Sequence, residues 1–377
     1  MRIVVPRETT ASDRRVALAP SAVKRLAGDD CSIAVESGAG LGASFSDDEY
    51  RDAGAEIVAA PDALLRGADV VLKVNPPAVR PDGFDEPAHL AENTLCIALM
   101  SPYENADLLA RLAERGVTSI AMELVPRTTK AQRMDALSAF STIAGYTAVL
   151  RAADALGKFF PMLTTAAGTM APARVFVLGA GVAGLQAIAT ARRLGAVVEA
   201  FDIRPAVKEQ VQSLGATFVE WEHDEAGDLE TEGGYAKEVS ESEQERERQL
   251  LSDHVATADV VITTALVPGR PAPRLVTAEM VQRMRPGSVI VDFAAASGGN
   301  CELTEAGETV VRDGVTIMGP LDLASSLPVH GSEMYGRVVS ALLAHATGED
   351  GALAIDLDDE ILGACVVTHG GKVRFQP

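Results

Sequence analysis

Cysteines and aromatic residues are scarce in this sequence and long apolar runs are missing, and each shortage excludes a class of protein. The four cysteines are far apart and include no CxxC pair, which argues against a disulfide framework or a bound metal. No apolar run approaches the ~18–20 residues of a membrane helix, and the N-terminus has no signal-peptide pattern. We therefore expect a soluble cytoplasmic protein with reduced thiols.

Positive charge is also in short supply. The chain has 33 Lys and Arg against 53 Asp and Glu, a formal net charge of −20, and nucleic acid is therefore not an expected partner. The acidity fits either a well-solvated surface or a salty cytoplasm. Because aromatics make up only 4%, small aliphatic residues must fill the core, as in parallel sheets covered by helices. The 377 residues fit two α/β domains.

Strand-length apolar runs alternate with helical patterns in two series. The first series runs from Arg2–Val5 to Thr118–Met122, and the second from Arg174–Leu178 to Val315–Met318. This alternation predicts parallel sheets. Between the series, the apolar segment Leu137–Phe159 predicts a long helix that joins two Rossmann-like, doubly wound domains.

The C-terminal tail predicts a discontinuous domain. It has a helical stretch, Glu333–Ala346, and no strand series of its own, so we expect it to pack on the first domain. The predicted domains are residues 1–136 plus 325–377, and residues 137–324.

A glycine-rich turn lies between the strand run Arg174–Leu178 and a helical run. The first glycine makes the tight turn, the second lets a pyrophosphate approach the backbone, and the third packs helix against strand. The helix N-terminus adds free N–H groups for the phosphates. The pattern predicts a dinucleotide site, and the alternative is a tight turn without a ligand. The residues concerned are Gly179, Gly181, Val182, Ala183 and Gly184.

Asp202 ends the next predicted strand, where an acidic residue binds the adenosine ribose. Its charge would repel a 2′-phosphate, which favours NAD(H) bound in the cleft between the domains. Ile203 and Arg204 complete this side of the expected site. Arg204 weakens the preference, because an arginine can accommodate a 2′-phosphate. Asp202 could also cap a helix before Pro205.

Oxidation of a hydroxy or amino acid would need an acid–base group beside the nicotinamide. None of the six histidines ends a predicted strand at the cleft. Lys73 does end one, although a solvated lysine is an equal alternative. The missing histidine favours direct hydride transfer between two nicotinamides.

Two polar segments stand out from this pattern. In the segment Arg127–Ser138, Asp135 and Ser138 are three residues apart, so they could hold a carboxamide together with Arg127; the alternative is a linker with a helix cap. The acidic segment Trp221–Gln249 fits either a solvated loop and an exposed helix or a mobile lid with Tyr235 at its tip.

Several segments together resemble the NAD(H)-binding component, domain I, of proton-translocating nicotinamide nucleotide transhydrogenase, which is related to alanine dehydrogenase. The resemblance covers nearly the whole chain. Residues 122–127 and 131–138 are the most specific segments of it. The other segments are residues 5–8, 15–18, 36–40, 165–169, 181–190, 233–238, 263–269 and 298–301.

The resemblance implies a role for each candidate residue. Arg127, Asp135 and Ser138 would grip the nicotinamide carboxamide, and Gln132 would reach toward NADP(H) on a partner subunit. Tyr235 would close a mobile loop over the site. The cofactor-binding set would also include Thr264, Ala265 and Leu266.

The resemblance also implies an activity and partners. Hydride would pass directly from NADH to NADP⁺, coupled to proton movement through a membrane-spanning subunit. The chain would be a homodimer, and an NADP(H)-binding subunit would complete the enzyme. Since the chain stops at Pro377 without a membrane helix, we expect a free subunit at the cytoplasmic face of the inner membrane.

Two departures from the related families bear on the reaction. Alanine dehydrogenase carries a catalytic histidine after the strand that here reads Leu95–Leu99, whereas this chain continues with Met100 and Ser101. Ala296 stands where the transhydrogenase family often has Glu. The alternatives to the transhydrogenase subunit are an amino-acid dehydrogenase and a non-catalytic NAD(H) sensor.

Overall fold

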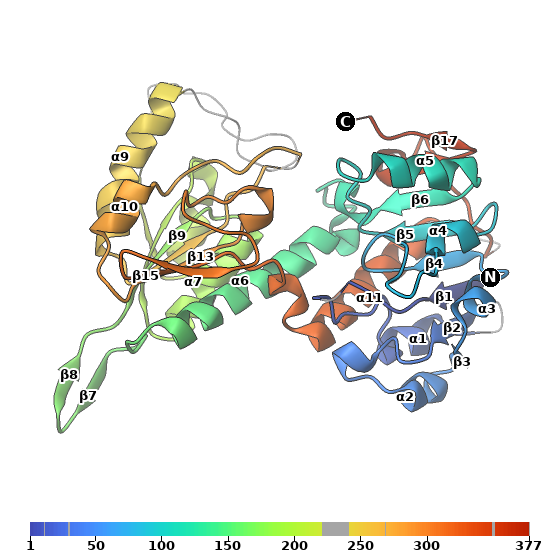
Figure 1. The fold of residues 1–377 in the computed structure, drawn as a ribbon, viewed down its shortest axis with the longest axis horizontal. Helices are drawn as coiled ribbons and strands as arrows, with labels where there is room; N and C mark the ends of the chain where they lie inside the picture. The colour runs from blue at the N-terminus through green and yellow to red at the C-terminus, as the bar shows by residue number, and fades with distance from the viewer. Residues whose placement is uncertain (11, 29–30, 221–240, 268, 349–350, 377) are drawn as a thin grey trace. The chain divides into compact units, whose positions relative to one another are not determined.

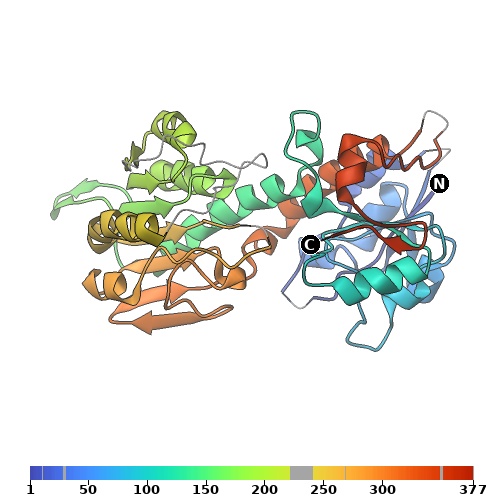
Figure 2. The same cartoon turned by 90° about the horizontal axis from the view of Figure 1, so that it is seen from above.

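The chain forms two compact units, each built on one mostly parallel sheet. The computed structural model describes residues 1–10, 12–28, 31–220, 241–267, 269–348 and 351–376. The first unit comprises Met1–Phe140 and Ser325–Pro377, and the second comprises Ser141–Ala324. The first boundary falls inside helix α6 (Ala136–Ala155). The predicted α/β class with two parallel-dominated sheets is confirmed (Figure 1 and Figure 2).

The sheet of the first unit has the order β17-β16-β6-β5-β4-β1-β2-β3. The strands from β3 to β6 are parallel, and their order is that of a dinucleotide-binding sheet. The parallel strands are β1 (Arg2–Val5), β2 (Ser32–Glu36), β3 (Glu56–Val58), β4 (Val70–Leu72), β5 (Leu95–Ala98) and β6 (Thr118–Ala121).

The tail contributes two strands that its sequence did not predict. The strand β16 (Val366–His369) pairs antiparallel with β6, and β17 (Lys372–Val373) pairs with β16. Both are too short to show a periodic pattern. His369 therefore ends a strand, but at the amino edge of β6, where its Nδ1 lies 3.0 Å from Thr118 Oγ1.

Helices cover this sheet on both faces. The helices α1 (Pro20–Leu26) and α11 (Pro328–His345) pack on each other. On the other face, Leu109 and Leu112 of α5 (Ala106–Glu114) join a core with alternate strand residues. The further helices are α2 (Asp47–Asp52), α3 (Pro61–Leu65), α4 (Glu86–His89) and α12 (Glu360–Cys365).

The sheet of the second unit has the order β11-β10-β9-β12-β13-β15-β14, which repeats the topology of the first. All neighbouring strands in it are parallel except β14 and β15. The strands are β9 (Arg174–Leu178), β10 (Val197–Phe201), β11 (Thr217–Phe218), β12 (Val260–Thr263), β13 (Val289–Asp292), β14 (Thr309–Arg312) and β15 (Val315–Met318).

Both faces of this second sheet are buried. Val177 packs in one core with Ile188 of α7 (Val182–Arg193), and Phe176 packs in the other with Val255 of α9 (Glu241–Thr257). The helices α8 (Lys208–Ser213) and α10 (Ala278–Arg283) complete the two layers. A hairpin of β7 (Leu163–Thr165) and β8 (Gly168–Met170) extends away from this sheet (Figure 1). Among the described helices, none has the length and apolar character that crossing a bilayer requires.

Candidate functional site

The glycine turn lies at the carboxyl end of β9, directly before α7. Gly179 has φ +95°, and a Cβ built on it would lie 2.7 Å from Thr264 Oγ1. A Cβ on Gly184 would lie 1.8 Å from the carbonyl oxygen of Gly179. The first position therefore needs a left-handed backbone, and the third needs direct contact between helix and turn. Neither position can accept a side chain without a shift of backbone.

Gly181 has a different surrounding. A Cβ built there would meet only the Arg204 guanidinium, at 4.0 Å, so the backbone at this point is open. Gly181 is also the N-cap of α7 and offers no side chain to bond the first-turn amides of Val182 and Ala183. Open backbone and free N–H groups at the N-terminus of a twelve-residue helix suit a phosphate.

Asp202 directly follows β10 and is 7% exposed. Its Oδ2 accepts hydrogen bonds from the Ala180 amide at 2.7 Å and from a terminal nitrogen of Arg204 at 2.7 Å. Its Oδ1 accepts from the Arg204 amide at 2.9 Å and from Arg204 Nε at 2.8 Å. The alternative role of Asp202 as a helix cap is wrong, because Arg204 is the N-cap of the short helix that begins at Pro205. Ile203 packs against the core beneath.

The segment after β12 touches the glycine turn. The Thr264 hydroxyl donates to the carbonyl oxygen of Gly179 at 3.1 Å. Ala265 packs on the core, and Leu266 is half-buried. The carboxyl ends of β9, β10 and β12 thus bring the glycine turn, Asp202 and Thr264 to one edge of the second sheet.

Asn300 is a residue that the sequence reasoning missed. It is fully buried, and its Oδ1 accepts from the Ala265 amide at 3.1 Å. Its Nδ2 donates to the carbonyl oxygens of Ala265 at 2.9 Å and Pro273 at 2.8 Å. The Asn300 amide therefore holds Ala265 by both backbone groups. Only its place in the Gly-Gly-Asn motif signalled it.

The polar segment 127–138 belongs to the first unit. Asp135 precedes α6, where its Oδ1 accepts from the Ser138 amide at 2.8 Å and its Oδ2 from the Ser138 hydroxyl at 2.6 Å. Arg127 Nε lies 4.0 Å from Asp135 Oδ2. The structure thus brings the three predicted residues together, and the helix cap that was an alternative is present. Gln132 is exposed at the start of the short 3₁₀ helix Gln132–Met134, directly before Asp135.

Lys73 is buried, not solvated. Its side chain is 2% exposed, and its Nζ lies 3.3 Å from Glu86 Oε1 and 3.6 Å from Glu8 Oε2. Burial alone would lower the pKa of Lys73, but the two carboxylates together raise it above its usual value. The Lys73 side chain is thus part of a buried ion cluster with Glu8 and Glu86.

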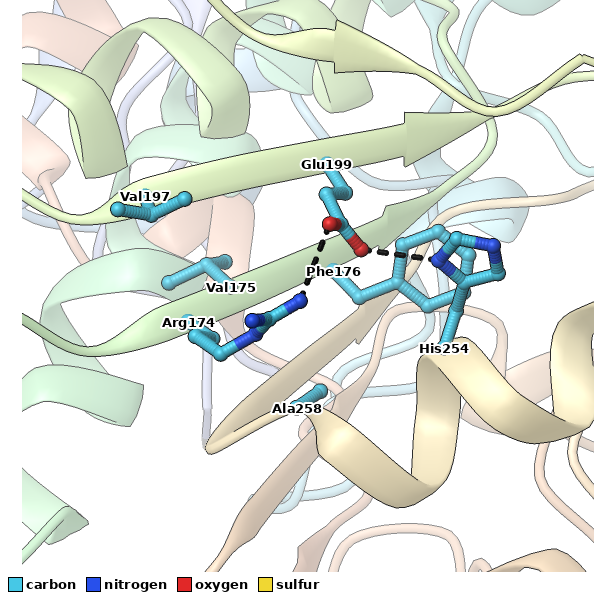
Figure 3. Close-up of a pocket in the computed structure, with 7 residues that line it drawn as sticks. All are labelled: Arg174, Val175, Phe176, Val197, Glu199, His254 and Ala258. Carbon is cyan, nitrogen blue, oxygen red and sulfur yellow. Dashed lines mark hydrogen bonds and ion pairs between the residues drawn. The ribbon is translucent and has the colours of Figure 1, made fainter.

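A shallow hollow lies on the face of the second sheet that α9 covers. Figure 3 shows the Glu199 carboxylate between Arg174 and His254. The ion pair with Arg174 measures 3.2 Å, and His254 Nδ1 lies 2.9 Å from Glu199 Oε2. Arg174 begins β9, so the hollow is not at the edge of the glycine turn. Within the described residues it encloses no volume for a ligand. Tyr235 and the rest of 221–240 lie outside the described residues.

A glycine turn at the end of the first strand and an acidic residue at the end of the second define a Rossmann-type nucleotide-binding protein. Residues 4–144 match the alanine dehydrogenase/PNT N-terminal domain, and residues 148–376 match the C-terminal domain of the same name. The chain therefore belongs to the alanine dehydrogenase/PNT family.

Within this family, the chain is more similar to transhydrogenases than to alanine dehydrogenases. An NAD(P) transhydrogenase alpha-subunit chain of Rhodospirillum rubrum is 43% identical, over 99% of this chain and 97% of the relative. A transhydrogenase structure from Sinorhizobium meliloti covers 99% of this chain and 100% of its own, with 44% identity and a TM-score of 0.88. An L-alanine dehydrogenase structure, covering 99% and 97%, has 27% identity and a TM-score of 0.79. The predicted resemblance is confirmed.

Proposed function

We propose that this chain is the NAD(H)-binding subunit of a proton-translocating transhydrogenase and that it passes hydride directly from NADH to NADP⁺ on a partner subunit. One observation carries the proposal. Arg127, Asp135 and Ser138, far from any glycine motif in the sequence, form one polar group at the start of α6. Besides capping α6, such a group can hold a carboxamide.

The candidate residues fall into two groups with different proposed roles. The glycine turn and the amides of α7 hold the pyrophosphate, and Asp202 lies where the adenosine ribose binds. In the first unit, Arg127 donates to the carboxamide oxygen, while Asp135 and Ser138 accept from its amide group. The bound dinucleotide supplies the hydride, and the protein's contribution is to fix the ring. Gln132 is exposed, as contact with a partner subunit requires.

An amino-acid dehydrogenase is the main alternative, and the strand β5 argues against it. Met100 follows this strand where alanine dehydrogenase carries its catalytic histidine, and it is fully buried. The amides of Met100 and Ser101 both donate to the Glu123 carboxylate, which holds this loop in place. No histidine follows this strand to take up a proton from an amino acid, and Lys73 is paired with the carboxylates of Glu8 and Glu86.

We further propose that the chain is a homodimer and associates with the membrane through its partner subunits. A two-stranded hairpin alone is marginally stable in water, and the side chains of β8 are exposed. A second copy that covers the hairpin would stabilise it. Sedimentation of the purified chain measures this directly, and a monomer at micromolar concentration would contradict it.

The activity is tested by mixing the purified chain with an NADP(H)-binding transhydrogenase component and following reduction of NADP⁺ by NADH. We expect hydride transfer only when both components are present. Tight NADH binding without transfer would overturn the proposal and leave an NAD(H) sensor. NADH formation from NAD⁺ and L-alanine by this chain alone would establish the dehydrogenase instead.

A further inference from the structure

Arg204 donates hydrogen bonds to the Asp202 carboxylate, which is the group expected to bind the adenosine ribose. An ionised carboxylate has about four acceptor positions. Three nitrogens of Arg204 and the Ala180 amide take up this capacity on Asp202, at 2.7 to 2.9 Å. The two side chains are only 12% and 5% exposed, so solvent and salt screen the pair weakly.

We infer that the Asp202–Arg204 pair, and not the charge of Asp202 alone, makes the second unit select NAD(H) over NADP(H). An arginine beside the ribose site is the group that takes a 2′-phosphate in NADP(H)-binding folds. Here its guanidinium is neutralised by a charge-assisted pair with both carboxylate oxygens. The inference rests on the proposed function, because it assumes that the adenosine ribose binds beside Asp202.

The position of Arg204 supports this role. Its terminal nitrogen lies 4.0 Å from the site of a Cβ on Gly181, which places it over the open side of the glycine turn. The following residue, Pro205, begins a short helix, so the backbone of Arg204 keeps its place. Among the described residues, Asp202 thus holds the Arg204 guanidinium with both of its carboxylate oxygens.

A cycle of four chains tests the inference: the wild type, Asp202→Asn, Arg204→Leu and the double variant. Asparagine keeps an oxygen for the Ala180 amide, so the turn is preserved, but it removes the charge that holds Arg204. Affinities for NADH and NADPH are measured by calorimetry, with thermal unfolding as a control for folding. We expect Asp202→Asn to tighten NADPH binding at least tenfold and the double variant to lose most of this gain. The gain should also shrink as salt is raised.

Equal gains in Asp202→Asn and in the double variant would overturn the inference, because repulsion by Asp202 would then explain the selectivity alone. No gain in Asp202→Asn, with NADH binding retained, would overturn it as well. If Asp202→Asn fails to fold, Asp202→Ser offers a hydroxyl to the same amide and gives the same comparison. Absence of NADH binding in the wild type would instead defeat the proposed function itself.

Discussion

Asp135 combines a structural and a proposed catalytic role in one carboxylate. It caps α6 through Ser138, and it lies 4.0 Å from Arg127. The orientation of the nicotinamide ring matters most in the transition state. A small displacement of the ring therefore lowers the rate of hydride transfer more than it lowers the affinity for NADH. We therefore expect Asp135→Asn to slow hydride transfer about tenfold or more while NADH affinity falls much less.

A matched control separates the two roles of Asp135. Asp359 is also a helix N-cap of the first unit, and it accepts hydrogen bonds from Ile361 at 3.0 Å and Leu362 at 2.8 Å. Asp359→Asn should alter stability like Asp135→Asn but leave the transfer rate unchanged. Rapid-mixing kinetics and calorimetry give the two quantities, and equal losses of rate and affinity in Asp135→Asn would refute the prediction.

A second prediction at the scale of single residues concerns Asn300 and the binding of NADH. Asn300→Ala leaves the amide and carbonyl of Ala265 without their partner, which costs about 1–3 kcal/mol of unfolding free energy. Because Ala265 adjoins Thr264, which bonds the glycine turn, we also expect NADH to bind roughly tenfold more weakly, about 1.4 kcal/mol. Denaturant unfolding and NADH titration measure the two effects.

The control for Asn300 is a partly buried hydrogen bond that does not involve Ala265. The Thr304 hydroxyl donates to Asp292 Oδ2 at 2.6 Å, in the same region of the second unit. Thr304→Val should lower stability without weakening NADH binding comparably. If both variants change the affinity equally, Asn300 has no special role in the binding segment.

At the scale of elements, the sequence predicted the strands that a local residue pattern determines. It missed the strands that form through contacts between distant parts of the chain. The run Arg174–Leu178 coincides with β9, because both of its faces are buried and every position is apolar after the first. By contrast, β16 and β17 have four and two residues, and β16 joins the sheet by pairing with β6, which is distant in the sequence. The role of Asn300 also escaped notice, since its partner Ala265 is 35 residues away.

The next prediction concerns the glycine turn that connects β9 to α7. Gly184→Ala puts a methyl 1.8 Å from the Gly179 carbonyl oxygen, so helix and turn must separate. We expect NADH binding to be lost and the melting temperature to fall. Gly181→Ala should keep the fold, because only Arg204 is near at 4.0 Å, but weaken binding by blocking the approach of the pyrophosphate.

Gly157→Ala provides the control for both glycine variants, since a Cβ there has no described atom within 4 Å. It should leave folding and NADH affinity unchanged. Wild-type affinity in Gly181→Ala would contradict the assignment of Gly181 to the pyrophosphate. Retained affinity in Gly184→Ala would show that the contact between helix and turn is dispensable.

At the scale of the whole molecule, two sheets of the same strand order differ in what occupies their central crevice. Ligands of such sheets bind where the order reverses, at the carboxyl ends of the first and fourth strands. In the second unit this place holds the open glycine turn. In the first unit the Glu8 carboxylate accepts from the amides of Val74 at 2.6 Å and Asn75 at 3.3 Å, and so joins the segments after β1 and β4.

The crevice of the first unit is therefore filled by its own charges, with Lys73 paired to Glu8 and Glu86. We expect each chain to bind one NADH, although two sheets have the dinucleotide-binding order. Calorimetry of the wild type should give a stoichiometry of one per chain, and Gly184→Ala should bring it to zero. Two sites per wild-type chain would mean that the first unit also binds the dinucleotide despite its closed ion cluster.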